Sequence, residues 1–86
     1  MIEVTYRPSF IRQIKVLEKS LFEEVLDSVE LFKSEKNHAS LKVHKLHGSL
    51  SGRYSFSVNY RFRIIFRYVS KKEAVLLAFG DHDLYR

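Results

Sequence analysis

Histidine, arginine and tyrosine side chains with chemical potential gather in the second half of the chain. The candidates considered first are His44, His47, Arg63, His82 and Tyr85. Imidazoles transfer protons near neutral pH, while a guanidinium stays charged and matches phosphoryl oxygens with two hydrogen bonds. Together they suit attack of a ribose 2′-hydroxyl on its adjacent phosphodiester, with a base, a cation and an acid. Because only RNA carries that hydroxyl, the pattern predicts that RNA is the substrate and that DNA is not cleaved.

Several of these residues, and two further tyrosines in the second half of the chain, also have an ordinary structural interpretation. His44 and His47 could be exposed loop residues, and Arg63 could be an exposed strand residue that serves solubility. Tyr54 and Tyr60 more often fill a core or a turn than stack on bases. The hypothesis of an RNA-cleaving site therefore depends on these side chains meeting in one place.

A metal site is the alternative interpretation of His44, His47 and His82. An H-x-x-H pair outside a helix is a weak signal for a metal. The chain has no cysteine, which excludes a disulfide, a thiolate ligand and a cysteine nucleophile. It also lacks a glycine-rich phosphate loop and a dinucleotide-binding fingerprint. We therefore expect no metal and no cofactor.

The positive charge is concentrated in one part of the chain. The formal net charge is +5. Residues 1–36 carry six basic and seven acidic side chains, whereas residues 37–86 carry nine basic and three acidic ones. This asymmetry favours a polyanionic partner for the second part.

Length and hydrophobicity predict a single small domain, residues 1–86. The chain has 86 residues, of which 45% are hydrophobic and 14% aromatic, enough for a core. No apolar run approaches the ~18 residues of a membrane span. The first eight residues lack the apolar stretch of a signal peptide. We expect a cytoplasmic protein without membrane contact.

The apolar spacing predicts two helices and four strands. Strands are expected at residues 2–6, 54–58, 62–68 and 74–79. One helix should begin at Pro8 and extend its apolar stripe to Leu21, and a second should run from an N-cap at Ser20 to Phe32. Residues 37–52 should be a connector, with a short turn of structure around residues 41–46.

The order of elements is therefore β-α-α-β-β-β, an α+β fold. It predicts a four-stranded, antiparallel-rich twisted sheet with a helical hairpin on one face. The helices should cover the face that bears Phe56, Ile64 and Phe66. Arg63 and Arg67 should lie on the opposite face, because side chains alternate along a strand.

Three sequence runs resemble the RelE/ParE superfamily of toxins. They are KLHGSLSGRYS at residues 45–55, YRFRIIF at residues 60–66 and GDHDLY at residues 80–85. The branch they are most similar to is the YoeB/YafQ-type mRNA interferases of bacterial type II toxin–antitoxin modules, and the resemblance covers essentially the whole chain. It implies a RelE-like fold whose concave sheet face binds mRNA. It also implies metal-independent cleavage of mRNA in the ribosomal A site, and a cognate acidic antitoxin that silences the toxin in a hetero-oligomer.

The resemblance further implies residue roles. Arg63 matches the arginine that contacts the scissile phosphate, His82 the general acid, and Tyr85 the aromatic residue that positions a base or a phosphate. His44 is the best match for the general base, with His47, three residues away, as its alternative, and Asp83 competes with His82 and Tyr85 for the terminal roles. Contacts to the backbones of mRNA and rRNA fall to Lys42, Lys45, His47, Arg53, Arg61, Arg67 and Arg86.

Two other functions stay open on the sequence alone. A ParE-like relative would bind and poison DNA gyrase without nuclease chemistry, and would not need His44, Arg63 and His82 as a set. A non-catalytic RNA-binding domain would use only the basic face. Substitution of a histidine would then be tolerated.

Overall fold

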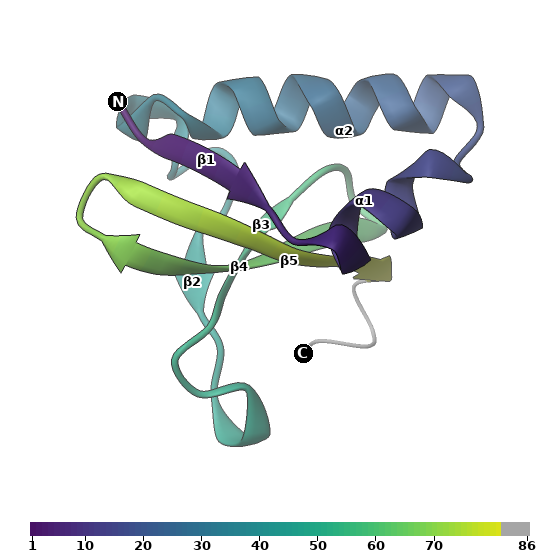
Figure 1. The fold of residues 1–86 in the computed structure, drawn as a ribbon. Helices are drawn as coiled ribbons and strands as arrows, with labels where there is room; N and C mark the ends of the chain where they lie inside the picture. The colour runs from purple at the N-terminus through teal and green to yellow at the C-terminus, as the bar shows by residue number, and fades with distance from the viewer. Residues whose placement is uncertain (82–86) are drawn as a thin grey trace.

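A mixed sheet with two helices on one face forms the molecule (Figure 1). The structure is a computed structural model, and it describes residues 1–81. The helices are α1 (Pro8–Lys15) and α2 (Lys19–Phe32), and short 3₁₀ turns follow as η1 (Glu35–Asn37) and η2 (Gly48–Leu50). The strands are β1 (Glu3–Tyr6), β2 (His44–Lys45), β3 (Tyr54–Ser57), β4 (Phe62–Ser70) and β5 (Glu73–Asp81). The predicted α+β class and helical hairpin are confirmed.

The strand count differs from the prediction by one edge strand. Within residues 1–81 the sheet has five strands in the order β1-β5-β4-β3-β2. β1 is parallel to β5, and the other neighbours are antiparallel. The additional strand, β2, has two residues, His44 and Lys45, and pairs with β3. The expectation of four strands was wrong because two residues are too few to show an alternation of apolar and polar side chains.

The helix pair covers the expected face of the sheet. Phe56, Ile64 and Phe66 are completely buried, and Phe32 of α2 packs against them. The ring of Phe32 lies 4.5 Å from that of Phe56 and 4.8 Å from that of Phe66. The contact between α2 and the sheet is therefore built on aromatic contacts of Phe32, stacked with Phe56 and edge-to-face with Phe66.

Truncation of Phe32 should remove the centre of this core. We expect Phe32→Ala to lower the free energy of unfolding by about 3–5 kcal/mol, because the cavity it leaves is lined by rigid sheet residues. Leu31→Ala is the matched control, since Leu31 is the preceding residue and is 49% exposed. Urea denaturation measures both. Equal losses for the two variants would contradict this account of the core.

The boundary between the helices differs from the prediction. α1 ends at Lys15, and the N-cap position of α2 is Glu18, whose backbone is extended at φ −63° and ψ 159°. Ser20 lies inside α2 and donates a hydrogen bond to the Glu18 carboxylate at 2.8 Å. The predicted N-cap at Ser20 is therefore wrong, and Leu21 belongs to α2. The N-cap is the residue whose backbone is extended just before the helix, and the residue types alone do not show which residue that is.

A β-bulge in β5 explains its nearly continuous apolar sequence. Ile65 pairs with Ala78, but Phe66 pairs with Leu76, so Leu77 is the extra residue. Leu76 and Phe79 are buried on the helix side although they are three residues apart. A bulge turns two successive residues toward the same side. Leu77 and Ala78 therefore lie on the other face, together with Ile65.

Candidate active site

The face of the sheet that the helices leave uncovered, which we call the open face, carries both His44 and Arg63. Paired residues of neighbouring strands point to the same side of a sheet. His44 pairs with Ser55, and Ser57 pairs with Arg63 two residues further along β3. Two strand spacings and an offset of two residues put the Cα atoms of His44 and Arg63 about 12 Å apart. Both side chains can therefore approach a phosphate that lies between them.

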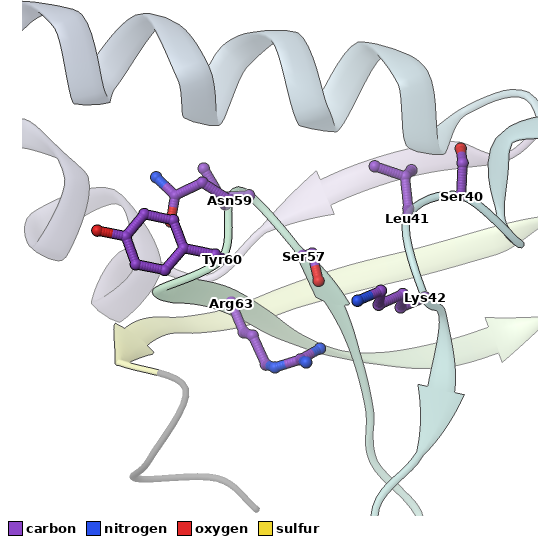
Figure 2. A pocket seen from close by; sticks show the side chains of 8 residues that line it. Ser40, Leu41, Lys42, Ser57, Asn59, Tyr60 and Arg63 are labelled. Carbon is purple, nitrogen blue, oxygen red and sulfur yellow. The ribbon is translucent and has the colours of Figure 1, made fainter.

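A pocket of about 480 Å³ lies at the β3–β4 turn on this face. Figure 2 shows Arg63 and Lys42 extending toward one another, from β4 and from the segment before β2. Nη1 of Arg63 is buried. The lining residues are Ser40, Leu41, Lys42, Ser57, Val58, Asn59, Tyr60 and Arg63. Two cations in one hollow suit an anionic group such as a phosphate.

Asn59 fixes the β3–β4 turn that borders the pocket. Its Oδ1 accepts hydrogen bonds from the backbone N–H groups of Arg61 and Phe62, at 2.8 Å and 2.9 Å. Its Nδ2 donates to the Glu24 carboxylate of α2 at 2.8 Å. The turn thereby holds Tyr60, which lines the pocket and is 95% exposed. An exposed aromatic ring beside cations can stack on a base.

Lys42 has a left-handed backbone, with φ of +58°. This conformation costs a residue with a side chain about 1–3 kcal/mol and tends to occur at functional sites. Hydrogen bonds hold it in place, from Lys42 N–H to the Ala39 carbonyl at 3.1 Å and from Val43 N–H to the His38 carbonyl at 3.0 Å. The sequence indicated Lys42 as an RNA contact but gave no sign of this backbone state, which glycine or asparagine would have signalled.

A glycine at position 42 separates the backbone strain from the charge. We expect Lys42→Gly to raise the free energy of unfolding by about 1 kcal/mol, because glycine adopts this φ without strain. The same variant should bind RNA less tightly, since one cation leaves the pocket. Lys45→Gly is the control, because the same replacement in the neighbouring strand β2 should lower stability. Thermal unfolding measures the stability of both variants. Equal destabilisation of the two would contradict the proposed backbone strain at Lys42.

The ring of His44 is oriented by the backbone of Lys42. Its Nδ1 lies 2.8 Å from the Lys42 carbonyl oxygen. A carbonyl only accepts, so we assign the proton of the neutral ring to Nδ1. The lone pair is then on Nε2, on a side chain that is exposed. This is the arrangement that a general base requires.

The structure does not gather all the predicted RNA contacts on the open face. Lys45 pairs with Tyr54, so it lies on the side opposite to His44. His47 is exposed in the loop that precedes η2. Tyr54 is half-buried and packs against Phe66, as expected for a core residue.

The other arginines predicted to contact RNA lie in different environments. The Nε of Arg61 lies 3.3 Å from the Asp81 carboxylate, and its guanidinium lies over the Phe62 ring at 5.0 Å. Arg67 is exposed on β4. Arg53, which precedes β3, lines a second pocket. His82, Tyr85 and Arg86 lie outside the described residues, so the roles predicted for them stay predictions.

Two side chains that do not line the pocket, Lys33 and Tyr68, have raised pKa values. Partial burial raises the pKa of the Tyr68 phenol, with a smaller contribution from Tyr54. A hydrogen bond from the Lys33 ammonium to the Glu30 carboxylate raises the pKa of Lys33. Neither group lines the pocket that holds Arg63 and Lys42.

Residues 1–81 contain no cluster of three or more histidine, cysteine or acidic side chains that could hold a metal ion. In the same part of the chain, both helices are too short to cross a membrane.

Comparison with known proteins places the fold. No family model and no curated protein matches the chain. A chain of the YoeB-YefM complex from Staphylococcus aureus matches with a TM-score of 0.72 and 16% identity, over 95% of this chain and 98% of that one. YafQ from E. coli strain BL21(DE3) matches with a TM-score of 0.72 and 17% identity, over 98% and 97%. The chain has the RelE-like fold.

A third similar structure comes from an archaeon. A chain of the RelE-RelB complex from Pyrococcus horikoshii OT3 matches with a TM-score of 0.71 and 17% identity, over 93% of each chain. The resemblance indicated by the sequence runs is thereby confirmed at the level of the fold. These neighbours are similar along nearly their whole length, so the RelE-like fold accounts for the whole described chain.

Proposed function

We propose that this chain is the toxin of a type II toxin–antitoxin pair and that it cleaves mRNA on the ribosome. The observation that carries the proposal is the oriented imidazole of His44 on the same sheet face as the Arg63–Lys42 pocket. The RelE-like fold, which this chain shares with chains of the YoeB-YefM and RelE-RelB complexes, supports the toxin role.

The proposed reaction is a transesterification within the RNA strand. Nε2 of His44 takes the proton of the 2′-hydroxyl, and the oxygen attacks the adjacent phosphorus while the bond to the 5′-oxygen breaks. Arg63 and Lys42 hold the non-bridging oxygens, whose negative charge grows in the transition state. An acid, for which we retain His82, protonates the leaving 5′-oxygen. The products are a 2′,3′-cyclic phosphate and a 5′-hydroxyl, and no metal takes part.

The proposed partners are an acidic antitoxin protein and the ribosome with its mRNA. A net charge of +5 suits both an acidic polypeptide and the phosphates of rRNA. We retain Arg53, Arg61 and Arg67 as candidates for backbone contacts, which position an RNA without reading its sequence.

Primer extension on translating ribosomes tests the proposal. The purified protein should produce new mRNA 5′ ends within ribosome-covered codons, and a 2′-O-methyl group at the cleaved nucleotide should abolish them. A supercoiling assay with DNA gyrase runs in parallel. Inhibition of gyrase together with intact mRNA would overturn the nuclease and favour the ParE-like alternative.

A further inference from the structure

A second hollow of about 370 Å³ lies on the open face, next to the Arg63 pocket. Apolar side chains of the sheet line it, and it also contains two arginines, Arg7 and Arg53. Arg7 comes from the segment between β1 and α1, and Arg53 from the residue before β3. The remaining lining residues are Ser9, Leu50, Ile65, Leu77 and Ala78.

The bulge in β5 and the start of α1 build this hollow together. Leu77 and Ala78 reach the open face because the bulge interrupts the alternation. The Ser9 hydroxyl donates to the Leu77 carbonyl at 2.9 Å, and the Arg7 N–H donates to the Leu76 carbonyl at 3.0 Å. These bonds fix the backbone of Arg7 against the bulge. Bulges often stand beside active sites, where they aim side chains.

The opposite border is equally well held. Arg53 N–H donates to the Leu50 carbonyl at 3.0 Å, and Leu46 N–H donates to the Arg53 carbonyl at 2.8 Å. The loop with η2 thus closes on itself beside the sheet, and it extends away from α2 (Figure 1). Arg53 is therefore attached to a defined backbone rather than to a free segment.

The two arginines have no carboxylate of their own within residues 1–81. The ion pairs in that part of the chain are Lys33–Glu30 and Arg61–Asp81. Two guanidinium groups around one hollow repel each other until an anion lies between them. An apolar floor between two cations matches a ligand with a flat apolar face and a phosphate, which is a nucleotide.

The position along β4 relates this hollow to the proposed cleavage site. Ile65 in the floor is two residues from Arg63 on the same strand and the same face, about 7 Å away. That distance is comparable to one nucleotide step of an extended single strand. We infer that the Arg7–Arg53 hollow is a subsite for a nucleotide flanking the scissile phosphate, with its base on the apolar floor and its phosphate on the arginines. The inference rests on the proposed function.

Oligoribonucleotides of two lengths test the subsite. Binding of a dinucleotide and a tetranucleotide, both 2′-O-methylated to block cleavage, is measured by fluorescence anisotropy at several salt concentrations. We expect Arg7→Gln and Arg53→Gln to weaken tetranucleotide binding about tenfold. The salt dependence should fall by about 0.7 in logarithmic slope for each variant. Dinucleotide binding should stay the same, because a dinucleotide fills only the Arg63 pocket. Arg12→Gln, an exposed arginine of α1 outside the hollow, is the matched control.

The outcomes separate the subsite from the nuclease, because cleavage on ribosomes by the wild type is measured alongside. Unchanged tetranucleotide binding by Arg7→Gln, with active wild type, overturns the subsite alone. Equal weakening for both lengths also overturns it, since Arg7 would then act on the whole surface. A wild type that binds with the expected length dependence but cleaves nothing supports the subsite and overturns the nuclease. No binding and no cleavage overturns both.

Discussion

Arg63→Ala should lower the rate of mRNA cleavage on ribosomes about 10²–10³-fold, the cost of losing one pre-organised donor to developing negative charge. The guanidinium extends from β4 into the 480 Å³ pocket, and its Nη1 is buried there. A donor that is already in place needs no rearrangement when the phosphorane charge develops. The loss should therefore appear in kcat, with substrate binding changed much less.

Two further variants test whether the effect comes from the geometry and position of the Arg63 guanidinium or only from its charge. Arg63→Lys keeps the charge but loses the two-pronged hydrogen bonding, so it should recover only part of the rate. Arg67→Ala removes the same charge from the same strand at an exposed position. It should reduce binding to the ribosome and leave kcat largely intact, as expected of a contact to a phosphate backbone. Circular dichroism and thermal unfolding confirm that each variant is folded.

The opposite pattern would remove Arg63 from the mechanism. If Arg63→Ala and Arg67→Ala lowered cleavage by the same factor and through binding alone, the open face would be a general basic surface. The pocket would then have no special role, and the non-catalytic RNA-binding alternative would gain support.

The features that the sequence predicted are those that depend on a repeated pattern. The alternation in β4 correctly separated Arg63 from Ile64 and Phe66, because nine strand residues give the alternation enough positions to be seen. The helical spacing likewise placed Phe32 against the sheet. In both cases burial of apolar side chains is strong enough to determine which face is covered.

The features that the sequence did not predict depend on single backbone conformations. The pairing of β2 rests on two residues, so the sequence could not place His44 and Lys45 on opposite faces. The left-handed Lys42 and the bulge at Leu77 are isolated departures from regular geometry. Local hydrogen bonds within residues 38–43 hold Lys42, and the Ser9 hydroxyl, distant in sequence, bonds to the bulge. Tyr60 was expected in a core or a turn, and the turn is confirmed. Tyr60 is nearly completely exposed there, in the turn that Asn59 ties to α2.

His44→Ala should lower the rate of cleavage by about 10²–10⁴-fold, the usual contribution of a general base. The sequence favoured His44 for this role and left His47 as the alternative. The structure gives a physical reason to favour His44, because the Lys42 carbonyl 2.8 Å from Nδ1 fixes the tautomer and leaves Nε2 to accept a proton. His47 lies in the loop before η2, where its contribution should be limited to RNA contact. His47→Ala is therefore the matched comparison, with a loss that appears in binding.

Chemical rescue distinguishes a base from a merely structural histidine. Free imidazole should restore part of the activity of His44→Ala, because the replacement leaves an exposed space that a small base can enter. His44→Gln fills the space and can still hydrogen bond, but it cannot accept the proton, so it should be as slow as His44→Ala and resist rescue. If His44→Gln instead kept wild-type activity, the imidazole would serve only to shape the loop. If His47→Ala were the slow and rescuable variant, the base would be His47, three residues further along and directly before η2. The carbonyl of Lys42 would then hold a ring that takes no part in proton transfer.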